Sequence, residues 1–367
     1  MAVTSRVFNR GYVNCLSVYG ISRALFLFSW GSNCNRSFVK GQHHARTDSQ
    51  ARHRATARQR REGRSGTVIA FRHILCPIDF SDTAARALTY ATAFAAWYEA
   101  QLTVLQVATR FDEPLEPVPI GDADRAPYPG SRDDIIARLR RSIEQAGATA
   151  LNVRPLAQEG RASELIVNCG AAMKADLLVM GTHGLGGFHR LLLGSVTEKV
   201  VRTATCPVLT VPPSAPATTA RPILFKKILC PIDHSPSSLK ALEYALELGR
   251  QADGCVTVLS ALEYMDAEEP CEHVDVDIRR NRQHFIDHAR ERLHAQLAGE
   301  PRTWCKIEEI VAINRAYKEI LQRAAASDTD LIVMGAQGSG GIELMLYGSN
   351  THHVVRAATC PVLTVRA

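Results

Sequence analysis

Glycine residues at a fixed spacing form the part of this sequence best suited to chemistry. The segment Gly181-Thr-His-Gly184 is followed by nine residues and then by Gly194-Ser195. Glycine lets the backbone approach a ligand closely, and consecutive amides can form a concave anion site. A helix that begins at Gly194-Ser195 would add free N–H groups that favour phosphate. The spacing therefore predicts a phosphate-binding loop.

The same glycine spacing occurs again 154 residues later, at Gly335, Gly338, Gly348 and Ser349. In neither copy does a lysine follow the glycine as in a Walker A loop. No G-x-G-x-x-G follows the first apolar run of either copy, which excludes the dinucleotide-binding fingerprint. The pattern indicates a phosphate site of another kind.

The repeat extends far beyond the glycines. HILCPIDFS at 73–81 recurs as KILCPIDHS at 227–235, and 19 of the 31 positions from Gly181 to Val211 are identical in the second copy. Such a repeat is typical of a duplicated domain. We predict an Arg-rich disordered extension at 1–67, a first domain at 68–211, a Pro-rich extended linker at 212–222 and a second domain at 223–367.

Short apolar runs alternate with amphipathic segments within each copy. Strands are predicted at 74–78, 102–107, 150–157, 177–180 and 208–211, and at 256–261 in the second copy. Helices are predicted after Ser81 and Ser235, and at 133–145, 161–175, 196–203 and 276–297. This alternation predicts two tandem α/β domains, each a doubly wound, Rossmann-like parallel sheet. Ligands of such sheets bind beyond the carboxyl ends of the strands.

The glycine pattern after the fourth strand, together with P-x-D at Asp79 and Asp233, resembles the universal stress protein family over about residues 71–367. More narrowly, it resembles the ATP-binding branch and its tandem members. The resemblance implies that Asp79 and Val107 face adenosine. It implies that the phosphates are surrounded by Gly181, Gly184, Gly194, Ser195 and Val196. The matching positions in the second copy are Asp233, Ala261, Gly335, Gly338, Gly348, Ser349 and Asn350.

The resemblance also implies a pairing of the two copies through their last strands, as a pseudo-dimer within one chain. We expect Mg²⁺ to accompany the ATP, with Asp79 as an acid near it. Further homo-oligomers and protein partners are left open.

The second copy differs from the first around the predicted phosphates. His183, His189, Arg190 and Lys199 are replaced by Gln337, Glu343, Leu344 and His353, and Val107 is replaced by Ala261. These changes remove positive charge and apolar contact area. We therefore predict that the first domain binds ATP more tightly than the second.

The net charge of +6 arises from the N-terminal part, because residues 1–72 carry 13 Lys/Arg and two acidic groups. Such a tail can be an organelle-targeting segment, a nucleic-acid-binding arm or a solvated extension. We favour the solvated extension because no helical periodicity organises the arginines, and we expect no nucleic-acid binding. No segment has the roughly 18 apolar residues of a membrane span. We interpret Cys76 and Cys230 as small buried hydrophobic residues rather than disulfide or metal ligands, and free cysteines of this kind are expected in a reducing cytoplasm.

Motifs of nucleophilic and metal-dependent hydrolysis are absent from the sequence: it contains no H-E-x-x-H and no G-x-S-x-G. His284 and His288 share a helical face but have no counterparts in the first copy, so we interpret them as solvated. The sequence predicts a nucleotide-binding stress or signalling protein that is not an enzyme. Two alternatives are a slow ATPase or adenylyl- or phosphoryl-transfer enzyme, and an interaction scaffold without nucleotide.

Overall fold

The computed structural model describes residues 69–108, 131–184, 193–216, 225–263, 276–298, 305–337 and 348–367. The predicted extension at 1–67 therefore lies outside the described residues. The first copy contains β1 (His73–Pro77), α2 (Asp82–Tyr98), β2 (Gln101–Ala108), α3 (Arg132–Gln145), β3 (Val153–Glu159), α4 (Ala162–Ala172), β4 (Leu177–Gly181), α5 (Ser195–Thr203) and β5 (Val208–Val211). The second contains β6 (Lys227–Pro231), α6 (Pro236–Ala252), β7 (Cys255–Leu262), α7 (Val276–Leu297), β8 (Lys306–Ile313), α8 (Ala316–Ala326), β9 (Leu331–Gly335), α9 (Ser349–Ala357) and β10 (Val362–Val365).

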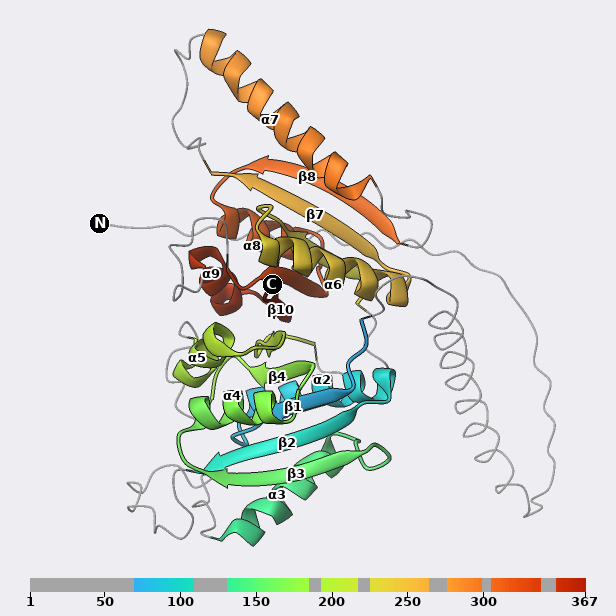
Figure 1. Ribbon diagram of the computed structural model, residues 1–367, viewed down its shortest axis with the longest axis vertical. Helices are drawn as coiled ribbons and strands as arrows, with labels where there is room; N and C mark the ends of the chain where they lie inside the picture. The colour runs from blue at the N-terminus through green and yellow to red at the C-terminus, as the bar shows by residue number, and fades with distance from the viewer. Residues whose placement is uncertain are drawn as a thin grey trace, which may run out of the picture. The chain divides into compact units, whose positions relative to one another are not determined.

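Both copies form the doubly wound parallel sheet that the sequence predicts. The strand order is β3-β2-β1-β4-β5 in the first copy and β8-β7-β6-β9-β10 in the second (Figure 1). Strand order reverses beside β1 and beside β6, each of which is flanked by a strand from either half of its copy. The carboxyl ends of β1 and β4, and of β6 and β9, are therefore where a ligand site is expected.

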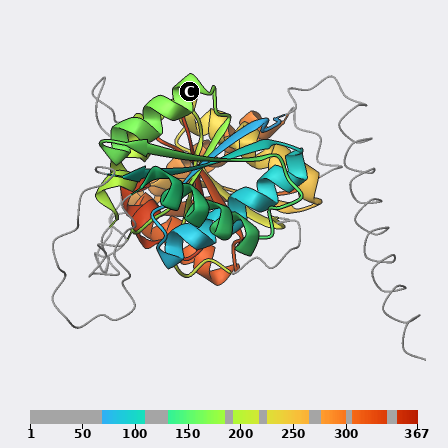
Figure 2. The ribbon, with the colours of Figure 1, turned by 90° about the horizontal axis from the view of Figure 1, so that it is seen from below.

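Helices cover both faces of the sheet, as seen from the end at which β3 and α3 lie (Figure 2). On one face, a single cluster of buried side chains joins α2, α3, α6 and α7 to the strands beneath them. On the other face, α4 and α5 cover one cluster, whereas α8 and α9 cover another. Neighbouring strand residues contribute to opposite faces, so that Ile74 belongs to the first cluster and Leu75 to that of α4 and α5.

The two copies join through their last strands into one ten-stranded sheet. β5 and β10 run antiparallel, with Leu209 opposite Leu363, and both side chains are fully buried. Two equivalent threonines reinforce the junction: Thr210 Oγ1 donates to Val362 O and Thr364 Oγ1 donates to Val208 O, each at 3.2 Å. This is the pseudo-dimer that the resemblance implies.

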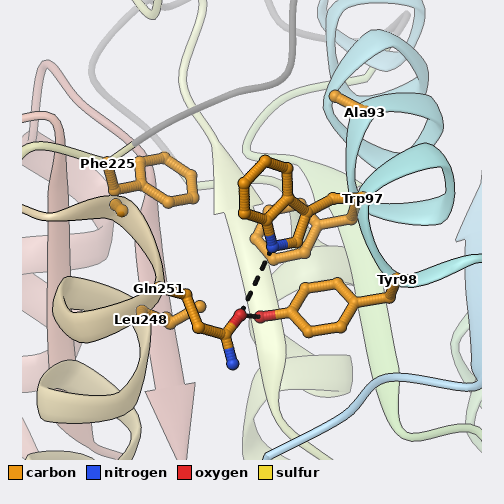
Figure 3. A pocket seen from close by; sticks show the side chains of 8 residues that line it. Ala93, Trp97, Tyr98, Phe225, Leu248 and Gln251 are labelled. Atoms are coloured by element: carbon orange, nitrogen blue, oxygen red, sulfur yellow. Dashed lines mark hydrogen bonds between the residues drawn. The ribbon is translucent and has the colours of Figure 1, made fainter. Parts of the chain in front are cut away.

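The helices above this junction also meet at equivalent positions. Trp97 on α2 and Gln251 on α6 are 154 residues apart, which is the offset of the repeat. Trp97 Nε1 and Tyr98 Oη both donate to Gln251 Oε1, at 3.3 and 2.6 Å (Figure 3). Phe94 and Phe225 pack beside them with ring centroids 5.7 Å apart. The domain contact therefore combines apolar packing with hydrogen bonds that fix one relative orientation.

The described part of the predicted linker, 212–216, differs from an extended spacer because it contains a turn. Ala215 is buried, and its carbonyl accepts a hydrogen bond from Arg86 on α2 at 2.6 Å. The following carbonyl, of Pro216, accepts one from Tyr90 Oη at 3.3 Å. These contacts explain the turn, because they fold the start of the linker back onto α2. Residues 217–222 lie outside the described part.

Candidate functional site

A tight turn at the end of β1 positions the first predicted site residue, Asp79. Its Oδ1 accepts hydrogen bonds from Ser81 N at 3.1 Å and from Ser81 Oγ at 2.6 Å. Ser81 is the N-cap of α2, where its Oγ accepts a bond from Ala84 N at 3.2 Å. Between them, Phe80 has a φ of +63°, and the equivalent His234 has a φ of +61°. Two non-glycine residues in this unfavourable conformation show that the fold imposes the same turn on both copies.

The glycine loop after β4 is anchored at both of its ends. Gly194 N donates to Thr182 O at 2.9 Å, and Thr197 Oγ1 donates to Gly181 O at 2.8 Å. Thr182 N in turn donates to Val211 O of β5 at 3.1 Å. Residues 185–192, which include His189 and Arg190, lie outside the described residues. The anchors nevertheless place the start of α5 directly beside the end of β4.

The three glycines of the repeated pattern in the first copy, Gly181, Gly184 and Gly194, have different surroundings. A Cβ on Gly181 would lie only 2.8 Å from Thr83 Cγ2, so this glycine permits β4 to pack against α2. A Cβ on Gly184 would overlap Asp79 Oδ2, which places the glycine backbone against that carboxylate. A Cβ on Gly194 would lie 3.3 Å from Thr182 O and 3.8 Å from His183 Cα. The structure thus brings Asp79, Gly181, Gly184 and Gly194 to one edge of the sheet.

Helix α5 begins without a side-chain cap at its N-terminus. Gly194 is its N-cap and supplies no side-chain acceptor, in contrast to Ser81 at α2. The N–H groups of the first turn, from Ser195 and Val196 onward, and the helix dipole both favour a negative group there. Val196 and Val107 pack against the same cluster of buried side chains under α4 and α5. The predicted apolar and anion-binding positions therefore lie in one region of the first copy.

His183 brings a neutral imidazole to this region. Its Nδ1 is 2.8 Å from Thr182 Oγ1, and its Nε2 is buried without a hydrogen-bond partner in the described part of the chain. Burial lowers the pKa of His183 below its ordinary value, because desolvation penalises the imidazolium form. A buried ring nitrogen without a partner is a feature that a bound polar group could satisfy.

The second copy repeats the anchors and adds hydrogen bonds at Gln337, where the described part of the loop ends. Thr351 Oγ1 donates to Gly335 O at 2.9 Å and Gly348 N donates to Ala336 O at 3.3 Å, as their counterparts do in the first copy. In addition, the Gln337 carbonyl accepts hydrogen bonds from the hydroxyls of Ser237 and Ser235. The described start of this loop, at Gln337, is thus held against the N-terminus of α6 by hydroxyl groups.

Most of the other predicted site residues of the second copy lie in elements equivalent to those of their counterparts in the first. Asp233 Oδ1 accepts bonds from Ser235 N at 3.0 Å and Ser235 Oγ at 2.6 Å, which reproduces the Asp79 turn. Ala261 lies in β7, and Ser349 begins α9 after an N-cap glycine, Gly348, without a side-chain cap. Gly338 lies outside the described residues. Asn350 is hydrogen-bonded within the protein, to Glu263 and to the backbone of Tyr317.

Two groups of site residues were missed by the sequence interpretation. Thr197 and Thr351 anchor the loops, and the signal was present as G-S-x-T in both copies. Glu263, which contacts Asn350, had no such signal because its position in the first copy is Thr109.

The fold and this edge define a doubly wound α/β protein with an uncapped helix start suited to an anion. The model of the universal stress protein family matches residues 70–212 and 224–366. The chain therefore belongs to the universal stress protein family, in which it carries two tandem domains.

Individual relatives agree with this assignment. The chain is 40% identical over 146 residues to a universal stress protein from Thermus aquaticus, covering 38% of this chain and 98% of the relative. It is 31% identical over 193 residues to one from Mycobacterium tuberculosis H37Rv, covering 53% of this chain but only 62% of that relative. A functionally unknown protein from Pseudomonas aeruginosa PAO1 has the same fold, with a TM-score of 0.56 at 19% identity; the match covers 82% of this chain and 95% of that one.

None of the described helices has both the length and the apolar character to cross a membrane. In the same part of the chain, no group of three or more His, Cys, Asp or Glu side chains is arranged to hold a metal ion.

Proposed function

We propose that this chain binds ATP at the carboxyl edge of its first domain and acts as a nucleotide-responsive stress or signalling protein. The observation that carries the proposal is the start of α5. It begins at Gly194 without a side-chain cap and is held beside the end of β4 by Thr182 and Thr197. Such a helix start provides backbone N–H groups for a phosphate.

Each residue has a role in this proposal. The amides from Gly194 to Val196, with the Ser195 hydroxyl, bind phosphate oxygens. Gly184 keeps the space beside Asp79 free of side-chain atoms, since any Cβ there would overlap the carboxylate. Asp79 accepts from the ribose hydroxyls, and Val107 supplies apolar contact to the base. Mg²⁺ would arrive with the nucleotide and neutralise part of the phosphate charge.

Binding rather than catalysis is the proposed role. Phosphoryl transfer in both domains would require a side chain in each that neutralises the charge of the phosphates. The first domain has Arg190 for this purpose, whereas the second has Leu344 at that position. Neutral His183, with its lowered pKa, is a hydrogen-bonding group rather than a cation at neutral pH. In this proposal, nucleotide occupancy changes which partner proteins the chain binds.

Native mass spectrometry of freshly purified protein tests the proposal. We expect an adenine nucleotide to remain bound to the full chain, and added ATP to bind again after the nucleotide has been removed. In the full chain, Ser195→Ala should weaken ATP binding more than the equivalent Ser349→Ala, because the first domain is the tighter site in this proposal. Failure of the full chain to bind ATP at millimolar concentration would rule the proposal out.

A further inference from the structure

A carboxylate occupies the region of the second domain that corresponds to the anion site of the first. Glu263 follows β7 at the carboxyl edge of the sheet. Its Oε1 accepts a hydrogen bond from Ala316 N, in the first turn of α8, at 2.9 Å. It accepts a second from Asn350 Nδ2, in the first turn of α9, at 3.1 Å. One side-chain oxygen therefore links the starts of two helices.

Asn350 completes the connection. Its Oδ1 accepts a hydrogen bond from Tyr317 N at 3.3 Å, so both ends of its amide are engaged by the protein. Asn350 follows Ser349 and is the counterpart of Val196, one of the positions assigned to phosphate. The polar group added at this position in the second copy thus binds a carboxylate of the same chain.

The electrostatics of this arrangement favour an anion supplied by the protein. α8 and α9 both lack a side-chain cap from their N-cap residues, Arg315 and Gly348. Glu319, in the first turn of α8, is engaged by Asn314 and Arg323. Glu263 is therefore an acidic group that interacts with the positive ends of both helices. A phosphate approaching the start of α9 would be repelled by this carboxylate, and it would lose part of the helix-dipole stabilisation that the carboxylate already uses.

The first domain lacks both partners of this contact. The repeat places Thr109 at the position of Glu263 and Val196 at the position of Asn350. Neither carries charge, and the valine packs against the core cluster under α4 and α5. This pair of residues is thus one difference between the two domains, in addition to the substitutions at His183, Arg190 and Lys199.

We propose that Glu263, held by Asn350, is an internal anion that keeps nucleotide phosphate out of the second domain. The chain then binds one ATP tightly, in its first domain. This inference rests on the proposed function and identifies the residue that restricts it to one site.

Isothermal titration of the full chain with ATP and with adenosine tests the inference. Glu263→Gln is the informative variant because it removes the charge while keeping an acceptor oxygen for Ala316 N and Asn350 Nδ2. Glu263 is exposed, so its charge is partly screened, and we expect this variant to gain a second ATP site whose affinity exceeds that of the wild type by about fivefold at low salt. Adenosine affinity should change less than twofold, since adenosine carries no phosphate. Glu291→Gln, at an exposed position of α7, is the charge-matched control and should behave as the wild type.

The reciprocal exchange is Thr109→Glu with Val196→Asn, which we expect to weaken ATP binding to the first domain by about tenfold. The inference is overturned if the wild-type chain binds two ATP molecules equally well. It is also overturned if Glu263→Gln matches Glu291→Gln, or if ATP and adenosine tighten together. Absence of ATP binding in every form would instead remove the proposed function, and this inference with it.

Discussion

At the scale of single residues, identical glycines serve different purposes. Gly181 and Gly335 are buried where a side chain would meet the first turn of α2 or α6, so their smallness is needed for packing. Gly184 lies against a carboxylate, and Gly194 begins a helix. Spacing alone cannot separate these purposes, because each depends on which atoms lie opposite the missing Cβ.

Gly184→Ala tests the role of this glycine in the proposed site. The added methyl group would displace Asp79 Oδ2, the end of the side chain that the proposal assigns to the ribose, so we expect ATP affinity to fall by about tenfold, which corresponds to about 1.4 kcal/mol. Fluorescence or calorimetric titration of the full chain measures this change.

Gly170→Ala is the matched control. Its Cβ would lie 3.7 Å from Leu75 Cδ2, an ordinary contact, and the position is inside α4, where alanine is favoured over glycine. Affinity in this variant should equal that of the wild type. Equal ATP affinities of the two variants would show that Gly184 is not part of the site.

At the scale of elements, the loop is positioned by contacts that join strand, loop and helix. Thr197 on α5 bonds back to the last residue of β4, and the side chain is almost completely buried. The second copy repeats this contact at Thr351. The helix start is thus fixed relative to the strand end, although the residues between them vary from one copy to the other.

Thr197→Val should destabilise the first domain. The substitution preserves shape but leaves Gly181 O without this donor in a buried position, for an expected loss of about 1–3 kcal/mol. The free energy of unfolding from urea titration measures it, and Thr197→Ser should restore much of the loss by returning a hydroxyl. Equal stability of the valine variant and the wild type would contradict the anchoring role.

At the scale of the whole molecule, the two domains share one core on the α2–α6 face of the sheet. The cluster includes Leu209 and Leu363 from the central strands together with Phe94 and Phe225. Tyr98 and Trp97 also bond to Gln251 across the junction. Part of the hydrophobic stabilisation of each domain therefore comes from side chains of the other domain.

We expect the two domains to unfold together. Cys76 and Cys230 are equivalent, fully buried thiols, and burial raises the pKa of each far above its ordinary value, so both should be unreactive in the folded protein. Alkylation during urea unfolding, read by mass spectrometry, should label both at the same urea concentration.

A core substitution in one domain sharpens this measurement. Leu363→Ala in β10 should cost about 2–5 kcal/mol and shift the labelling of both cysteines to lower urea concentrations. A shift confined to Cys230, or separate midpoints in the wild type, would show that the domains unfold independently.

The sequence by itself determined the duplication, the alternation of strand and helix, and the edge of the sheet to which the proposed site is assigned. These follow from local patterns: apolar periodicity, caps such as Ser81 and Ser235, and glycines repeated at one spacing. Several boundaries moved by two or three residues. One example is the third strand, predicted at 150–157 and found at Val153–Glu159, because a turn in which Leu151 N bonds to Ala148 O precedes it.

Only the tertiary structure decided which polar groups meet across distant segments. Glu263 and Asn350 are 87 positions apart in the chain, and Trp97 and Gln251 are 154 apart, yet each pair shares a hydrogen bond. Their partnership depends on how strands and helices pack, and local propensity carries no information about it. The sequence could place a phosphate-binding pattern in each domain, but the contact of Glu263 with the starts of α8 and α9 became visible only when β7, α8 and α9 were brought together.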